Sequence, residues 1–282
     1  MQRRAFLAAV GGGAVALSGC LGGTSGTTPR GTPCSSLDGM QGPKAGDDLP
    51  ADDTPADGYS PAFETAPEVC SVDPDSFDTV SRRGEEVPRA PVEAAYYWYA
   101  RGEARFVDAR GTGQYEASHI YGAVSSPYHG NLVEDPVETW PKDARIVCYC
   151  GCPHHLSSIR VADLLAAGYE EAYVIEEGFW ETERYGPGWV PKNYPIAEGG
   201  VESAPAARTI EGQVPARFAG ETAWARHASS DQAEAAEIGA DGRFALHLYF
   251  SGLTDDDEIT VETPAYRVTA PLADLTGGVV TA

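Results

Sequence analysis

The sequence predicts an α/β domain with a parallel sheet flanked by helices, followed by an all-β sandwich. Between residues 87 and 190, short runs of β-branched and aromatic residues alternate with helical segments, which is typical of a parallel sheet. Beyond about residue 198 the helical periodicity stops and strand-like runs separated by turn residues follow, as in a sandwich. A polar segment precedes both. We therefore expect four regions, 1–20, 21–84, 85–195 and 205–282.

Residues 1–20 have the pattern of an export signal. Arg3 and Arg4 precede an apolar run at 6–17 that is shorter than the roughly 20 apolar residues a membrane span requires. The paired arginines resemble a twin-arginine signal, and residues 17–20 resemble a lipobox. These resemblances imply that Cys20 is lipidated and that the exported protein is anchored by lipid to the outer face of the cytoplasmic membrane.

The segment 21–84 is dominated by Gly, Ser, Thr, Pro and Asp. Little apolar surface is available to offset the entropy of ordering, so we expect a disordered tether. With Cys20 lipidated, five cysteines remain, and the odd number leaves at least one thiol unpaired within the molecule. An oxidising compartment favours disulfides, and Cys34 could bridge Cys70; the sequence leaves that pairing open.

The chain is markedly acidic, with a formal net charge of -22. Removal of residues 1–19 takes away Arg3 and Arg4 and no acidic residue, so the mature chain carries -24. Such a charge argues against nucleic acid or anionic lipid as a partner, and we expect membrane attachment through the lipid anchor only. Few lysines beside many Asp, Glu and Ala suggest the surface of a halophilic protein.

The α/β region is expected to contain three helices and three strands. A helix is expected from about Pro91, because proline suits the first turn of a helix. The segment RFVDAR predicts a short buried strand, and a second short helix follows around 114–117. After the apolar run AVSSPY, the segment IVCYC predicts a strand, SSIRVADLLAAG a helix that ends at Gly168, and EAYVI another strand.

The C-terminal region predicts about seven short strands. Strand-like runs occur in TIEGQVPARF, ETAWARH, GRFALHLYF and EITVE, and the dipeptide Asp241-Gly242 is a strong hairpin signal. The DGRF turn and the strand spacing loosely resemble the carboxypeptidase-regulatory type of β-sandwich module. Such a module would contribute contacts with a partner.

A cysteine at the end of a predicted strand is the candidate nucleophile. Cys150 closes the run IVCYC and is followed at once by a loop and a helix. Loop amides and a helix N-terminus favour a bound anion, and the same field lowers the pKa of a thiol. The candidate substrate-binding loop consists of Gly151, Cys152, Pro153, His154, His155, Leu156 and Ser157.

Residues 87–190 resemble a single rhodanese domain. The segment VDARGTGQYEASHIYGA matches the first motif of that family at Asp108, Arg110, Tyr115, His119, Ile120, Gly122 and Ala123. Cys150 stands where the family has its catalytic cysteine, and VIEEGFW resembles the segment after the next strand. The loop after Cys150 is one residue longer than is common, and Glu177-Gly178 replaces a glycine pair, two differences that bear on the choice of substrate rather than on the fold.

The resemblance implies a sulfurtransferase. Cys150 would take a sulfane sulfur from a small sulfur-containing anion such as thiosulfate, hold it as a persulfide, and pass it to a nucleophilic acceptor such as a thiol or cyanide. Two successive displacements predict ping-pong kinetics. The resemblance implies no metal and no organic cofactor. Asp108, Arg110 and His119 would support the fold near the site rather than contact the donor.

The roles of the two neighbouring cysteines differ. Cys152 could attack the persulfide, release sulfide and leave a disulfide with Cys150, or it could simply fill space in the loop. Cys148 alternates with Cys150 on the predicted strand and is most simply a small buried apolar residue.

Three other functions are compatible with parts of the sequence. Cys150, Cys152, His154 and His155 are metal-ligand types, but zinc sites normally use two ligand pairs separated by a longer segment. A cysteine phosphatase needs an arginine that closes the loop, whereas the first arginine, Arg160, lies inside the predicted helix. A non-catalytic binding or scaffold module at the cell surface is the main alternative, and the presence of Cys150 favours sulfur transfer over it.

Overall fold

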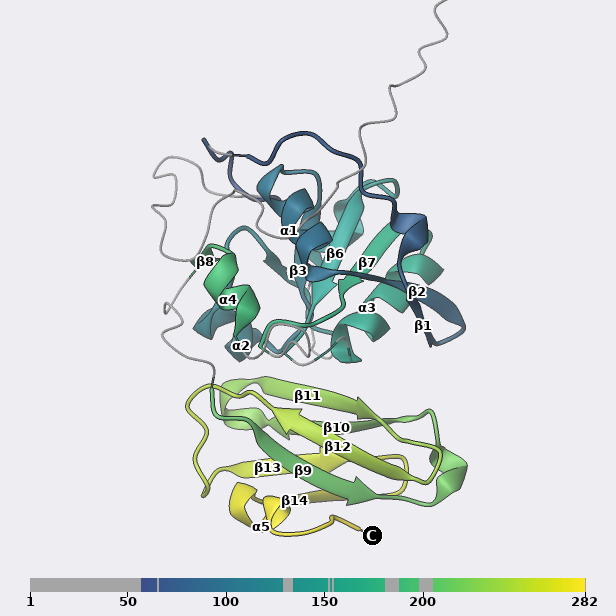
Figure 1. Ribbon diagram of the computed structural model, residues 1–282. Coiled ribbons are helices and arrows are strands. Elements are labelled where there is room, and N and C mark those ends of the chain that lie inside the picture. The colour runs from purple at the N-terminus through teal and green to yellow at the C-terminus, as the bar shows by residue number, and fades with distance from the viewer. Residues whose placement is uncertain are drawn as a thin grey trace, which may run out of the picture. The chain divides into compact units, whose positions relative to one another are not determined.

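The α/β region is built on a six-stranded sheet with the order β1-β2-β7-β6-β3-β5 (Figure 1). The computed structural model describes residues 57–64, 66–128, 134–151, 153, 155–180, 188–197 and 205–281. The strands of this sheet are β1 (Thr79–Arg82), β2 (Glu85–Ala90), β3 (Arg105–Asp108), β5 (Val124–Ser125), β6 (Arg145–Tyr149) and β7 (Glu171–Ile175). All neighbours pair in parallel except β1, which is antiparallel to β2. The predicted α/β class is confirmed, with a mixed rather than a purely parallel sheet.

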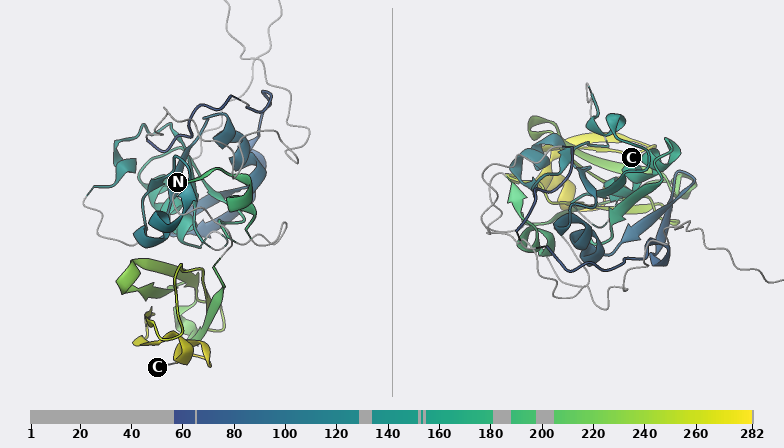
Figure 2. Two further views of the ribbon diagram at one scale, coloured as in Figure 1. Left: turned by 90° about the vertical axis from the view of Figure 1, so that its left-hand side faces the viewer. Right: turned by 90° about the horizontal axis from the view of Figure 1, so that it is seen from above.

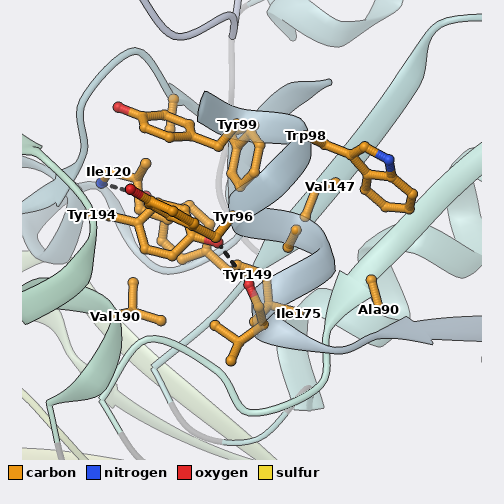
Figure 3. Packing of buried hydrophobic residues seen from close by; sticks show 14 of the residues in the cluster. Ala90, Tyr96, Trp98, Tyr99, Ile120, Val147, Tyr149, Ile175, Val190 and Tyr194 are labelled. Atoms are coloured by element: carbon orange, nitrogen blue, oxygen red, sulfur yellow. Dashed lines mark hydrogen bonds between the residues drawn. The ribbon is translucent and has the colours of Figure 1, made fainter. Parts of the chain in front are cut away.

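Helices cover both faces of this sheet (Figures 1 and 2). Alternate residues of the strands point to opposite faces. Phe106, Val147 and Ile175 join a core with α1 (Val92–Ala100) and α4 (Trp189–Asn193). Val107, Cys148 and Val174, on the other face, join a core with α3 (His155–Ala166). Figure 3 shows the first core, which is rich in tyrosine.

Shorter elements complete the α/β region. These are α2 (Thr112–Ala117), the strand pair β4 (His119–Ile120) and β8 (Ile196–Ala197), and the 3-10 helices at Pro74–Ser76 and Pro136–Thr139. The predicted helices at 91 and 114–117 and the predicted strands in RFVDAR, IVCYC and EAYVI are confirmed. Helix α3 begins at His155, two residues before the predicted start. None of the helices in the described ranges is long and apolar enough to cross a membrane.

The folded region begins before the predicted boundary at residue 84. Strands β1 and β2 form a hairpin whose turn residues Arg83 and Gly84 both have positive φ, 52° and 87°, the requirement of a type I′ turn. Further upstream, the Tyr97 hydroxyl donates to the carbonyl of Cys70 at 2.8 Å and accepts from its N–H at 3.0 Å. Part of the expected tether is therefore folded, with β1 in the sheet and Cys70 packed on α1, a correction to that expectation.

Cys70 takes part in a disulfide. The expected partner, Cys34, lies outside the described residues, as do the whole of the predicted signal and the predicted lipidation site Cys20.

The C-terminal region contains only antiparallel sheets among its described residues, consistent with the predicted sandwich. One sheet has the order β11-β10-β13-β14, and the other pairs β12 with β9. Their bounds are β9 (Arg208–Gln213), β10 (Thr222–His227), β11 (Gln232–Glu237), β12 (Arg243–Leu248), β13 (Glu258–Glu262) and β14 (Arg267–Pro271). Leu246 of one sheet and Val261 of the other share one buried core, which also includes Leu272 of α5 (Leu272–Thr276).

The Asp241-Gly242 turn does not form the expected hairpin. Gly242 has a φ of 81°, as such a turn requires, but the turn connects β11 with β12, and these strands belong to different sheets. Because β12 pairs with β9 instead, the turn carries the chain from one sheet of the sandwich to the other. Strands β11 and β14 were not expected from the sequence.

Candidate functional site

Cys150 lies at the carboxyl end of the parallel sheet. It follows β6 directly, and β6 lies between β7 and β3. In open α/β sheets, ligands bind at this end of the strands. Helix α3 begins five residues later, at His155. The chain therefore turns from a central strand into a helix N-terminus within a short loop, as the sequence predicted.

The thiol of Cys150 has a hydroxyl neighbour. The Oγ of Ser157 lies 3.3 Å from the Sγ of Cys150, and both residues are fully buried. Ser157 belongs to the first turn of α3, so the helix places this hydroxyl beside the sulfur. A hydroxyl at that position can donate to a thiolate and stabilise it.

The segment after β7 holds the start of the loop. The N–H of Phe179 donates to the carbonyl of Cys150 at 2.8 Å, and the N–H of Trp180 donates to that of Gly151 at 3.0 Å. Of the predicted loop, the structure describes Gly151, Pro153, His155, Leu156 and Ser157. Cys152 and His154 lie outside the described residues. The role of Cys152 as a resolving thiol stays a prediction.

Arg110 and Asp108 form a buried ion pair close to the loop. The Nη2 of Arg110 lies 2.6 Å from the Oδ2 of Asp108 and donates to the carbonyl of Ser118, also at 2.6 Å. Burial opposes the guanidinium charge, but the charge and hydrogen bonds of Asp108 outweigh it, so the pKa of Arg110 is raised. These contacts fit the expected role of both residues in supporting the fold.

His119 also packs against a neighbouring residue of the same motif. Its ring stacks on Tyr115 with a centroid distance of 3.8 Å, and its Nδ1 lies 2.8 Å from the Tyr115 carbonyl. The neighbouring Ile120 donates its N–H to the hydroxyl of Tyr149 at 3.1 Å, a contact visible in Figure 3. The motif around His119 is thus hydrogen-bonded to β6, the strand that directly precedes Cys150.

Cys148 and Arg160 make contacts that support the fold rather than the candidate site. Cys148 is free and fully buried, and burial raises the pKa of its thiol to about 12. It is the small buried apolar residue that the alternation with Cys150 predicts. Arg160 forms an ion pair with Asp135 and lies within α3, so it does not close the loop as a phosphatase arginine would.

Glu177 is a buried titratable residue whose importance the sequence does not reveal. Its Oε2 accepts the N–H of Val92 at 2.9 Å, at the first residue of α1. Burial, followed by the nearby Glu93, raises the pKa of Glu177 to about 7. The only sequence signal is that a glutamate stands where the rhodanese family has the first glycine of a pair.

Strand β11 also contributes to the surroundings of Cys150. Ala235 belongs to the same buried cluster as Cys150 and Leu156, and Tyr128 and Trp224 pack against that cluster. These residues belong to the compact unit that comprises residues 32–282. No sequence pattern pointed to Ala235, because β11 itself was not expected.

Comparisons with known proteins support the domain assignment. A family model described as "Rhodanese-like domain" matches residues 92–183. Together with the sheet order and the position of Cys150, this match makes that part of the chain a rhodanese-like domain. A search of curated proteins found no match.

Two solved structures are similar to part of the chain. One is the NMR structure of a rhodanese-like domain from Anabaena, with 20% identity, a TM-score of 0.33, and coverage of 41% of this chain and 83% of that one. The other is a crystal structure of the same Anabaena protein, with 23% identity, a TM-score of 0.26, and coverage of 35% and 80%.

The described residues contain no group of three or more His, Cys, Asp or Glu side chains arranged to hold a metal ion. Two of the four ligands considered for a metal site, Cys152 and His154, are not among them.

Proposed function

We propose that the rhodanese-like domain is a sulfurtransferase in which Cys150 carries a sulfane sulfur. The observation that carries this proposal is the position of a buried thiol at the end of β6, beside the Ser157 hydroxyl and ahead of the N-terminus of α3. A helix N-terminus and a hydroxyl both favour thiolate over thiol. The thiolate is the form that attacks sulfur.

The reaction consists of two displacements. The Cys150 thiolate attacks the outer sulfur of a thiosulfate-like donor, the sulfur–sulfur bond of the donor breaks, and sulfite leaves with the electron pair. The resulting persulfide is then attacked at its outer sulfur by a nucleophilic acceptor, a thiol or cyanide, which regenerates the Cys150 thiolate. The loop amides and the α3 N-terminus stabilise the charge that develops, and ping-pong kinetics follow.

The mass of the intact protein tests this proposal. The reduced mature chain is incubated with thiosulfate in high salt, and wild type is compared with Cys150→Ser and Cys152→Ser. We expect a gain of one sulfur atom that is lost in the Cys150 variant. A longer-lived adduct in the Cys152 variant would assign Cys152 the role of resolving thiol. Absence of any adduct on the folded wild type would contradict sulfur transfer from this donor.

A binding or scaffold module is the second candidate. The full burial of Cys150, to which β11 contributes, favours it. The same mass experiment separates the two functions, because a pure binding module gains no sulfur.

The proposed location rests on residues 1–20. An exported, lipid-anchored protein should partition with membranes, and Cys20→Ala should release it into the soluble fraction. Retention of the variant at the membrane would argue against the lipid anchor.

A further inference from the structure

A hollow of about 440 Å³ lies on the four-stranded sheet of the C-terminal region. Strand β10 contributes Thr222, Trp224 and Arg226 to its lining. The residues between them belong to the buried core of the sandwich, so these three point away from that core. Glu262 of β13, which lies directly opposite Trp224, and Tyr128 of the α/β region also line the hollow.

Two stacked rings hold Arg226 in the hollow. The ring of Tyr128 stacks on that of Trp224, with a centroid distance of 5.5 Å and an angle of 14° between the planes. The guanidinium carbon of Arg226 lies 4.7 Å from the centroid of the Trp224 ring. Such a contact positions a guanidinium without any hydrogen-bond acceptor. Trp224 therefore fixes the place of a cation.

Arg226 and Glu262 lie close together but are not hydrogen-bonded. The Nε of Arg226 is 3.9 Å from the Oε2 of Glu262, which is longer than a hydrogen bond. Within the part of the chain that the structure describes, neither side chain makes a hydrogen bond. The two side chains are 33% and 44% exposed. Their donors and acceptors are therefore accessible to a small ligand.

The charges around Arg226 balance one another, although the chain as a whole carries -22. Burial is the main cause that lowers the pKa of Arg226. Glu262 and Asp231 act to raise this pKa, and the second guanidinium, Arg267, acts to lower it. Two cations and two carboxylates thus act at one place. A simple anion or cation meets both attraction and repulsion there, whereas a zwitterion can place each charge beside an opposite one.

The hollow adjoins the residues that bury the candidate nucleophile. Tyr128 and Trp224 line the hollow and also pack against the buried cluster that contains Cys150. The N–H of Tyr128 donates to the carbonyl of Ala109, a member of the same cluster, at 3.4 Å. The two stacked rings therefore border the hollow on one side and the cluster of Cys150 on the other.

We propose that the hollow binds an amino-acid thiol such as cysteine, with its carboxylate on Arg226 and its ammonium group on Glu262, as the acceptor of sulfur from Cys150. This inference rests on the proposed sulfur transfer. The acceptor thiolate attacks the outer sulfur of the Cys150 persulfide, the sulfur–sulfur bond breaks, and the Cys150 thiolate leaves with the electron pair. The transferred sulfur keeps its proton, so the product is the acceptor's hydropersulfide. Because Cys150 is fully buried, the rings of Tyr128 and Trp224 move apart for this step.

The rate at which the persulfide loses its sulfur tests this inference. The reduced mature chain is loaded with thiosulfate, freed from the donor, and mixed with increasing concentrations of cysteine, and the intact mass follows the loss of sulfur. In wild type we expect the rate to saturate. In Arg226→Gln we expect the half-saturating concentration of cysteine to rise at least about tenfold, the effect of one lost hydrogen bond between charged groups. Transfer to cyanide should not change.

Two analogues of cysteine test the assignment of the charges. Cysteamine lacks the carboxylate, so Arg226→Gln should not raise its half-saturating concentration. The analogue 3-mercaptopropionate lacks the ammonium group, so Glu262→Gln should raise the half-saturating concentration of cysteine but not that of this analogue. Arg243→Gln is the matched control, since Arg243 belongs to β12 of the other sheet, and it should keep the wild-type values.

Failure of the inference and failure of the proposed function give different results. A half-saturating concentration of cysteine in Arg226→Gln within twofold of wild type overturns the inference and leaves sulfur transfer intact. An equal rise for cysteine and cysteamine also overturns it, because the loss would not concern the carboxylate. Absence of a persulfide on folded wild type overturns the proposed function and the inference with it. If Arg226→Gln does not fold, Glu262→Gln decides alone, and an unchanged value for cysteine there overturns the inference.

Discussion

The Oγ of Ser157 lies 3.3 Å from the Sγ of Cys150, and helix α3 holds it there. The two residues are seven positions apart in the sequence, but the loop and the first turn of the helix bring them together. A thiolate at Cys150 gains a hydrogen bond that a thiol gains only weakly, so the contact favours the ionised form.

Loss of this hydroxyl should make the thiol less acidic. We expect Ser157→Ala to raise the pKa of Cys150 by about one unit, because a hydrogen bond to a charged group contributes ~1.5 kcal/mol. The measurement is the pH dependence of the ultraviolet absorbance of the thiolate, with Cys150→Ser as the blank. Ser158→Ala is the matched control, since the Ser158 hydroxyl donates to the His155 carbonyl instead. Equal pKa values in the two variants would contradict the proposed role of Ser157.

Gly113 of α2 tests whether the residues that precede β11 pack against α2 in solution. Gly113→Ala adds a methyl group that would overlap the Ser230 carbonyl oxygen, and we expect it to lower the free energy of unfolding by about 2 kcal/mol. The sign is informative, because alanine in a helix free of that contact would stabilise it by ~1 kcal/mol relative to glycine. Urea denaturation measures the difference.

Gly278→Ala is the control for that experiment. A Cβ on Gly278 has no neighbour within 4 Å, so its effect should stay within ~0.5 kcal/mol. Stabilisation by Gly113→Ala would mean that α2 and the residues before β11 are not in contact in solution.

The buried pair of Arg110 and Asp108 should contribute strongly to stability. Asp108→Asn leaves the guanidinium buried without its counter-ion, and loss of one partner of such a pair costs ~3 kcal/mol or more. Asp163→Asn removes the partner of Arg83 at the surface and should cost less than ~1 kcal/mol. Comparable losses in the two variants, measured by urea denaturation, would show that the buried pair is not special.

The α/β part was predictable because its signals are local. The segments RFVDAR and IVCYC are short apolar runs, and Pro91 and Gly168 delimit helices by their backbone preferences. The position of Cys150 followed from the same pattern, since a residue between the end of β6 and the start of α3 lies near a helix N-terminus; its role as nucleophile stays a prediction. The Arg83-Gly84 turn was locally encoded too, but the polar composition around it concealed the hairpin.

Strand β11 was not predictable from its own sequence. Its residues, QAEAAE, are good helix formers with no β-branched side chain. They form a strand because five of the six are buried between β10 and the α/β region, so packing outweighs propensity. The approach of Glu234 to the start of the Cys150 loop was missed for the same reason: only the folded chain brings residue 234 next to residue 151.

The raised pKa of Glu177 predicts how stability depends on pH. Because burial raises that pKa from 4.5 to about 7, the folded protein binds a proton that the unfolded chain releases between these values. Stability should therefore be greatest below about pH 4.5 with respect to this group and decline as the pH rises through 7. Glu177→Gln keeps an acceptor for the N–H of Val92 and carries no charge, so the decline should disappear.

Urea denaturation of the two proteins across the pH range measures this effect. We expect Glu177→Gln to be more stable than wild type by about 2 kcal/mol at pH 8, less than the full shift implies because the side chain is not completely buried, and to match wild type near pH 4. Glu176→Gln is the matched control, since Glu176 pairs with Arg89 at 3.2 Å and its loss should not stabilise the protein at pH 8. A Glu177→Gln variant that is less stable than wild type at pH 8 would mean that the carboxylate is favourable where it lies, and would assign the residue a structural ion contact instead.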